Sequence, residues 1–216
     1  MRHALNDQER LHLDRLTAEA EKRTGAQIVL AVIERCDTYP ELPWKAFALA
    51  AAVAGLSASA ANLFRPGWAS GTAVLFSVVA TLAAGSAAAL FCVFLPKFGR
   101  LFLDAHRAEA EVRQYADSLF LSRGLFATRG RTGILVLVGL FERQVVVIPD
   151  TGLREHLDPD TLQGIVSQMA TALSSGRVAA ALEGGLAGIE QVLSGAVPAV
   201  PGENELPDEV VEEKGI

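Results

Sequence analysis

The sequence predicts an α/β domain that is interrupted by a hairpin of two membrane-spanning helices. Two uncharged apolar runs, 46–64 and 72–95, lie close together in the first half of the 216-residue chain. On both sides of them, segments with helical periodicity alternate with short apolar runs that are typical of buried strands. We therefore expect one sheet, with helices on both of its faces, built from chain that precedes and follows the hairpin.

The two apolar runs have the length of membrane spans. They contain 19 and 24 residues without a charge, and a spanning helix needs about 20. The segment between them, 65–71, contains Pro66 and Gly67 and should reverse the chain. Trp44 and Trp68 stand at the starts of the two runs, where interfacial aromatic residues belong. A buried hairpin in a soluble protein is the alternative, but a domain this small cannot enclose two such helices.

The basic residues predict the orientation of the hairpin. Five of them flank its outer ends and one lies in the turn: Arg35, Lys45, Lys97, Arg100 and Arg107 against Arg65. Positive charge stays on the cytoplasmic side of a membrane. We expect a multi-pass protein of the bacterial inner membrane whose termini and soluble domain are cytoplasmic.

Neither span contains an ionisable residue other than Cys92. Transport paths and proton relays need charged or titrating groups at membrane depth, so this argues against a transporter, a channel or an intramembrane protease. Each span does carry small residues four apart: Ala51, Gly55 and Ser59, then Thr81, Gly85 and Ala89. Such rows suit a tightly packed hairpin or a homodimer contact, although an alanine-rich run also produces them by chance.

The composition divides the chain into a first domain segment, the hairpin, a second domain segment and an acidic tail, with boundaries 1–43, 44–96, 97–195 and 196–216. The tail carries a net charge of −5 out of −6 for the whole chain, and nothing in this balance suggests nucleic-acid binding. Residues 197–202 include two prolines and should form a flexible linker. Leu206 and Val210, four apart, should dock the tail on the domain; a wholly disordered tail is the alternative.

The segment before the hairpin predicts a helix followed by a strand. Asn6 is a candidate N-cap, and Glu9 three residues later completes a capping box. An apolar stripe that includes Leu13 follows, and Gly25 should end the helix. The continuous apolar run 27–33 then predicts a buried strand.

The segment after the hairpin predicts three helices and two strands. A long helix should span 98–123, with Ala105, Val112, Tyr115, Ala116 and Leu119 on one side and Gly124 at its end. The apolar runs 134–138 and 145–148 are joined by a turn short enough for an antiparallel hairpin. Asp158, followed by Pro159, should cap a further helix, and a last helix should carry Val178, Leu182, Ile189 and Leu193. The strand 27–33 should pair with 134–138 in parallel through a right-handed crossover that contains the hairpin.

Several short segments, in this order, resemble the TPM domain family in the form found in bacterial membrane proteins, where two spans interrupt the domain. They are Ala20–Gly25, Asp37–Tyr39, Arg131–Val136, Phe141–Arg143, Asp150–Leu153 and Asn204–Asp208. The resemblance implies an α/β/α sandwich. It implies no single chemistry, because relatives have been linked to acid phosphatase activity, divalent-metal binding, photosystem repair and receptor modulation. One departure is Gln27, where similar proteins commonly have Glu.

Two carboxylates are candidate ligands for Ca²⁺ or Mg²⁺. With a parallel crossover, Asp37 follows the carboxyl end of the first strand, and Glu142 lies in the turn after the second. Both should then lie at one edge of the sheet, where loop carboxylates suit hard cations. The alternative is two solvated turn acids. Gln27 begins the first strand, about 30 Å away at 3.3 Å per residue, and should not belong to this site.

Three arginines, Arg123, Arg129 and Arg131, occupy a glycine-containing loop. They could hold a phosphate or another anion, or lie near anionic lipid headgroups. No phosphate-binding glycine loop, histidine pair or nucleophile elbow accompanies them. We therefore expect a non-enzymatic binding or modulatory domain that acts on a membrane-associated partner. The alternative is a metal-dependent phosphatase-like hydrolase.

Overall fold

The computed structural model describes residues 4–64, 71–194, 206–207 and 209–215. The chain divides into two compact units, of which the first combines Met1–Asp37 with His106–Ile216 and the second is Thr38–Ala105. The predicted turn at 65–71 (apart from Gly71), with Trp68, and the predicted linker at 197–202 lie outside the described residues. The two units are described separately below.

The first unit begins with helix α1, Asp7–Thr24, whose ends are fixed by local hydrogen bonds. The Asn6 side chain accepts from the Glu9 amide at 2.8 Å, and the Glu9 carboxylate accepts from the Asn6 amide at 2.9 Å. This reciprocal pair is the predicted capping box. Gly25 ends the helix at φ 69°, a left-handed conformation that glycine adopts without strain.

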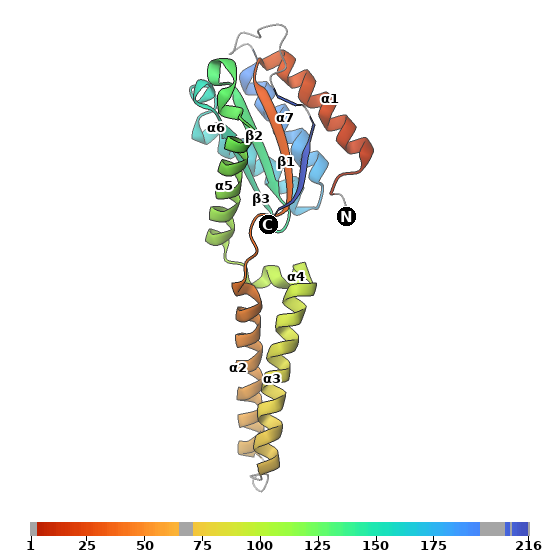
Figure 1. Cartoon of the computed structure of the whole chain (residues 1–216), viewed down its shortest axis with the longest axis vertical. Coiled ribbons are helices and arrows are strands. Elements are labelled where there is room, and N and C mark those ends of the chain that lie inside the picture. Colours follow the sequence, from red (N-terminus) through yellow and green to blue (C-terminus); the bar gives the residue numbers. More distant parts are fainter. Residues whose placement is uncertain (1–3, 65–70, 195–205, 208, 216) are drawn as a thin grey trace. The chain divides into compact units, whose positions relative to one another are not determined.

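A four-stranded mixed sheet with the order β3-β2-β1-β4 forms the centre of this unit (Figure 1). Strand β1, Gln27–Arg35, pairs in parallel with β2, Gly133–Gly139. Strand β3, Gln144–Pro149, returns antiparallel to β2. The predicted parallel and antiparallel pairings are both confirmed, and the α/β class with them.

The fourth strand, β4, comes from the acidic tail. Residues Val211–Gly215 pair in parallel with β1, and Val210 is buried in the core. The predicted docking of Leu206 and Val210 is therefore correct, but a strand was not expected there. Consecutive glutamates disfavour strands, and here the surroundings outweigh that preference.

Alternate residues of β1 and β2 enter two separate hydrophobic cores, one on each face of the sheet. Ile28, Leu30 and Val32 pack with α1, with α6, Pro159–Ser174, and with α7, Val178–Leu193. Their neighbours Val29, Ala31 and Ile33 pack on the other face, against α5, Ala105–Ser122. Because both faces are covered, the central strands are apolar throughout rather than alternating.

The long helix predicted at 98–123 is interrupted. The chain instead forms α4, Pro96–Gly99, the short 3₁₀ helix η1, Arg100–Phe102, and, after a break, α5. Leu103 lies in the break with an extended backbone, φ −75° and ψ 125°. Val112, Ala116 and Leu119 of α5 are buried as expected, but Ala105 is exposed because it only begins the helix. Three further 3₁₀ turns complete the first unit: η2, Leu125–Ala127; η3, Arg129–Arg131; and η4, Thr151–Leu153.

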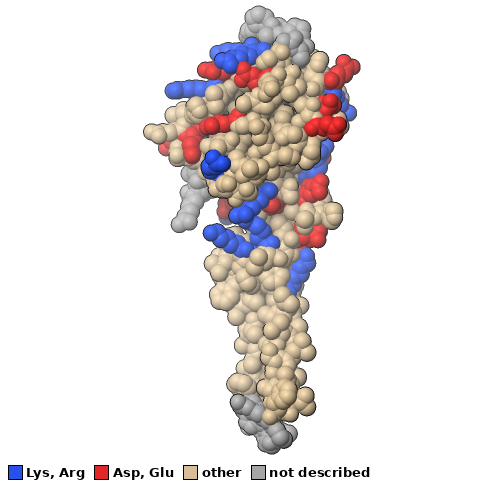
Figure 2. Space-filling model, turned by 180° about the vertical axis from the view of Figure 1, so that it is seen from behind, with Lys and Arg blue, Asp and Glu red and all other residues tan. Residues whose placement is uncertain are grey.

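The second unit is a helical hairpin with an apolar surface. Helices α2, Glu41–Phe64, and α3, Gly71–Phe94, have 24 residues each and mean hydropathies of 1.7 and 2.1. Their long apolar side chains point outward: Leu56 is 72 % exposed and Phe76 is 65 % exposed. Figure 2 shows no charged side chain over most of the hairpin face turned to the viewer. By length and composition both helices could cross a membrane.

The packing around η4 generates a prediction about stability. A Cβ on Gly152 would overlap the carbonyl oxygen of Gly130 and lie 2.8 Å from that of Arg131. We expect Gly152→Ala to lower the free energy of unfolding by about 1–3 kcal/mol, measured by urea unfolding of the detergent-solubilised protein. The control is Gly164→Ala in α6, where a Cβ meets nothing within 4 Å. This substitution should raise the free energy of unfolding by up to about 1 kcal/mol. Equal stability of the two variants would contradict this account.

Candidate functional site

The structure brings Asp37 and Glu142 to the same edge of the sheet, beyond the carboxyl end of β1. The turn that contains Glu142 is fastened there by two backbone hydrogen bonds. The amide of Leu140 donates to the Ile33 carbonyl at 2.9 Å, and that of Phe141 donates to the Glu34 carbonyl at 3.1 Å. The parallel pairing of β1 with β2 is what places this turn beside the residues that follow β1.

Glu142 is buried, with 6 % of its surface exposed, and it binds the backbone of the next loop. Its Oε1 accepts a hydrogen bond from the Cys36 amide at 2.9 Å. A Cβ on Gly139 would lie 2.9 Å from Glu142 Oε2 and 3.4 Å from Cys36 Sγ. The glycine therefore leaves room for a carboxylate and a thiol to lie together under the turn.

The surroundings of the Cys36 thiol favour its protonated form, which is a poor nucleophile. Burial raises its pKa well above the ordinary value, and the neighbouring Glu142 carboxylate, the hydrogen bond to it and the charge of Glu111 raise it further. Because the thiolate is the reactive form, a raised pKa keeps this sulfur inert at neutral pH. Cys36 and Cys92 are both free cysteines.

Asp37 already has a cationic partner in the protein. Nη2 of Arg107 lies 3.0 Å from Asp37 Oδ2 and 3.1 Å from a carboxylate oxygen of Glu111. Arg107 therefore bridges two acids at this edge. Within the described residues, no three His, Cys, Asp or Glu side chains are grouped so that they could hold a metal ion. A cation bound here would take most of its ligands from backbone carbonyls and water.

Gln27 lies at the opposite edge, as its position at the start of β1 predicts. Its amide donates to the Thr132 carbonyl at 3.0 Å, and its side-chain oxygen accepts from the Leu206 amide at 3.1 Å. This residue therefore fastens the tail, and it takes no part in the arrangement around Asp37 and Glu142.

The three arginines of the glycine-containing loop have different surroundings. Arg123 Nη2 donates to a carboxylate oxygen of Glu213 at 2.8 Å, whereas Arg131 Nε lies 3.2 Å from Asp150 Oδ2. Arg129 is exposed and also makes an interaction within the protein. An anion bound by this loop would compete with the carboxylates that Arg123 and Arg131 already pair with.

A groove of about 440 Å³ lies between α5 and β4, and the sequence reasoning missed it. Its lining combines hydroxyl groups with one ion pair: Tyr115, Ser118, Leu119, Ser122, Arg123 and Glu213. The Tyr115 hydroxyl donates to Glu213 at 2.8 Å. Burial is the main cause of the raised pKa of Tyr115, and this hydrogen bond is the second. The spacing of Tyr115, Leu119 and Arg123 by four residues marks one face of a helix and was the available signal.

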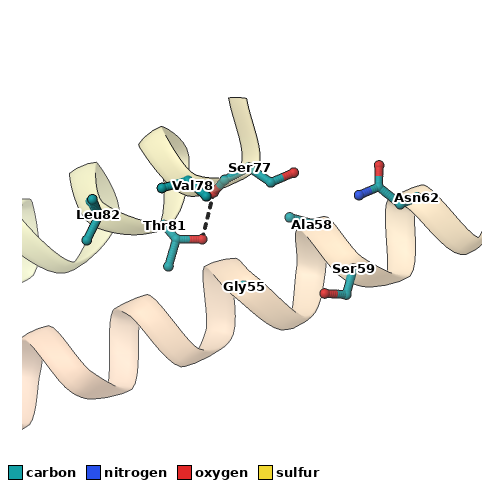
Figure 3. Close-up of a pocket in the computed structure, with 8 residues that line it drawn as sticks. All are labelled: Gly55, Ala58, Ser59, Asn62, Ser77, Val78, Thr81 and Leu82. Atoms are coloured by element: carbon teal, nitrogen blue, oxygen red, sulfur yellow. Dashed lines mark hydrogen bonds between the residues drawn. The ribbon is translucent and has the colours of Figure 1, made fainter. Parts of the chain in front are cut away.

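Gly55 of α2 and Gly85 of α3 both lie against the other helix of the hairpin. A Cβ on Gly85 would lie 2.8 Å from the Phe47 ring, and one on Gly55 would lie 3.8 Å from the Thr81 hydroxyl. Beyond Gly55 the helices enclose a groove of about 280 Å³ that is partly lined by Ser59 and Asn62 (Figure 3). The structure thus uses Gly55 and Gly85 in the contact between α2 and α3, as expected for a tightly packed hairpin.

The edge with Asp37 and Glu142 generates a prediction about metal binding. With two carboxylates at most, we expect Ca²⁺ and Mg²⁺ to bind weakly, with dissociation constants on the order of 10⁻⁴–10⁻³ M. Titration calorimetry of the detergent-solubilised protein should show this binding and its loss in the Asp37→Asn, Glu142→Gln double variant. Asp117→Asn, an exposed acid paired with Arg113, is the matched control. Identical titrations of wild type and double variant would assign both acids to the loop structure alone.

Comparisons with known proteins agree with this fold. The chain resembles the NMR structure of the BA42 protein from the psychrophilic bacterium Bizionia argentinensis, with a TM-score of 0.60 and 13 % identity. The alignment covers 99 % of this chain and 98 % of that one, and at this identity it shows a common fold only. No curated protein matches the chain. A family model described as the TPM domain matches residues 69–192, more than half of the sequence, and the chain therefore belongs to the TPM domain family.

Proposed function

We propose that the protein is a membrane-anchored TPM domain that binds or modulates a membrane-associated partner at the cytoplasmic surface, without chemistry of its own. The main support for a membrane anchor is the apolar, outward-facing surface of α2 and α3. The most hydrophobic stretch of α2 has none of its residues buried, and that of α3 has 6 %. In water such a surface would be far larger than the apolar patches of soluble proteins.

The proposed orientation rests on basic residues at the ends of the hairpin. Lys45 lies in the first turns of α2, and Lys97 and Arg100 follow α3. Lys45 Nζ lies 3.4 Å from the Phe102 carbonyl, so the two ends of the hairpin are tied together at this level. Since positive charge is retained on the cytoplasmic side of membranes, these residues support a cytoplasmic location for the outer ends of the hairpin and for the domain attached to them.

A binding role is supported by the interactions that the two candidate metal ligands and the nearby Cys36 already make within the protein. Glu142 accepts from the Cys36 amide, Asp37 pairs with Arg107, and the Cys36 thiol has a raised pKa. Each group therefore stabilises the loops around it. Two exposed apolar side chains of the first unit, Leu121 at 62 % and Phe126 at 40 %, flank Arg123 in sequence and suit contact with another protein.

A metal-dependent phosphatase-like hydrolase is the second candidate. Two observations favour it: the name of the matching family model contains the word phosphatase, and parallel pairing brings Asp37 and Glu142 to one edge of the sheet. A hydrolase needs convergent carboxylates and an activated nucleophile or metal-bound water. Turnover of a generic phosphomonoester that is lost on chelation would favour this candidate over the binding role.

The anchor predicts how the chain fractionates. Wild-type protein should stay in membranes that are washed with alkaline carbonate. The Leu75→Arg, Val79→Arg double variant places two charges on exposed positions of α3. A charge costs up to about 2.5–3.5 kcal/mol to insert at a span centre, so this variant should be released. Leu11→Arg is the control, because Leu11 is 57 % exposed on α1, outside the hairpin. Release of the wild type would refute the anchor.

The orientation of the hairpin can be measured by thiol labelling of intact cells. In a variant without native cysteines, Gly67→Cys should react with an impermeant thiol reagent added outside, whereas Gly202→Cys should react only after the cells are opened. Both positions lie outside the described residues, so their choice rests on the sequence. Labelling of Gly202→Cys alone in intact cells would reverse the orientation.

The binding role predicts a discrete partner. A photo-crosslinking amino acid at Leu121 or Phe126 should give one adduct of defined mass in native membranes, which mass spectrometry then identifies. The same probe at Glu155, an exposed loop position, is the control and should give none. Absence of an adduct from Leu121 and Phe126 would count against this surface as the site of binding.

A further inference from the structure

Strand β4 is an acidic segment that enters a sheet, and its surroundings explain why. It pairs with β1 from Ala31 opposite Val211 to Arg35 opposite Gly215. It occupies an edge of the sheet, where a strand has one neighbour and is easily exchanged for another strand. The contacts made by Val210–Gly215 explain why this segment, rather than another strand, pairs with β1.

Both consecutive glutamates form hydrogen bonds or ion pairs with groups on either side of this sheet edge. Glu212 accepts from the Leu5 amide at 3.1 Å and pairs with the Arg10 guanidinium. Glu213 accepts from Arg123 and from the Tyr115 hydroxyl, each at 2.8 Å. The two carboxylates therefore point to opposite faces of the sheet, one toward α1 and one toward α5, as successive residues of a strand must.

The residues before and after the glutamates are also specified. Val210 is buried in the core beneath α1, and its amide donates to Asp14 Oδ1 at 3.0 Å. Val211 packs against the opposite core. Gly215 has φ 78°, and a Cβ there would overlap the Arg35 carbonyl oxygen. The edge thus selects the pattern Val-Val-Glu-Glu-x-Gly.

We propose that this seat, formed by β1 with Arg10, Arg123 and Tyr115, binds the C-terminal strand of a second copy of the chain, so that two copies exchange their β4 strands. The groups that contact β4 belong to α1 and the residues before it, to β1, and to α5 with the Arg123 that follows it. They would meet the same pattern on a strand from either copy. A second copy is the partner that carries the whole pattern by identity. Exchange of identical elements requires no new interface chemistry.

The segment between α7 and β4 limits how far the strand can reach. Eleven residues, 195–205, join the end of α7 to the described part of the tail, and eleven residues can span at most about 40 Å. Copies held in one membrane also meet at a high effective concentration. The inference rests on the proposed binding role of the domain, and the proposed anchor adds to it only through this effective concentration.

Disulfide trapping in the full chain tests the exchange. In a Cys36→Ser, Cys92→Ser background, one tagged chain carries Ala31→Cys and a differently tagged chain carries Val211→Cys. Neighbouring strands lie about 4.8 Å apart, within the Cα range of a disulfide. Ala31 is 0 % exposed, so only a strand seated on β1 can reach it. Oxidation of membranes from co-expressing cells should give a disulfide that joins the two tags.

Two controls give the result its meaning. Adding Gly215→Val to the Val211→Cys chain should remove the inter-chain product, since the side chain collides with Arg35. One chain with both cysteines shows that the pair can form within a copy. If that disulfide forms while the inter-chain product is absent, β4 stays in its own copy and the proposal is wrong. A discrete adduct from Leu121 or Phe126 would still leave the binding role standing.

A second measurement avoids any change in the core. One chain carries Arg123→Glu and the other carries Glu213→Arg. Without exchange, positions 123 and 213 then carry charges of the same sign within each copy. After exchange, position 123 of each copy faces a charge of opposite sign at position 213 of the other copy. Co-purification of the two tags should therefore rise severalfold over that of two Arg123→Glu chains. Equal co-purification would overturn the exchange.

Discussion

The structure of the first unit depends on β1, a strand that is buried on both faces and paired on both edges. Its side chains alternate between two cores, one beneath α1, α6 and α7 and one beneath α5. Its partner strands, β2 and β4, come from far later in the chain. The unit can therefore form only when the chain before the apolar hairpin meets the chain after it. Such non-local pairing is costly in loop-closure entropy, and the apolar burial of β1 offsets that cost.

Parallel pairing of β1 with β2 also explains why the hairpin can be inserted here. Two parallel neighbours need a long crossover between them, and the hairpin and α5 together form that connection. The chain leaves the unit after Asp37 and returns at His106. The salt bridge from Arg107 to Asp37 joins the segment that leaves this unit to the segment that returns to it. Asp37, a candidate metal ligand, therefore also holds together the two ends of the inserted segment.

Charged groups in this unit mostly hold segments of chain together. Glu142 binds the loop after β1 through the Cys36 amide, and Glu212 and Glu213 seat β4 against α1 and α5. A buried or half-buried carboxylate must be hydrogen-bonded or paired to repay its desolvation. Here the partners are backbone amides and arginines, which makes loop and strand placement the role of these acids. The same logic makes the β4 seat selective for sequence.

The sequence by itself determined whatever depends on short-range patterns. The Asn6–Glu9 capping box, the apolar run of β1 and the uncharged lengths of α2 and α3 each predict their element, because capping, burial and hydropathy act over neighbouring residues. It also placed Asp37 and Glu142 at one edge, since that follows from parallel pairing. Only the tertiary structure decided the rest. Arg107 and the Cys36 amide became the partners of those acids. The acidic tail became a strand because the arginines, the tyrosine and the edge of β1 that stabilise it lie far away in sequence.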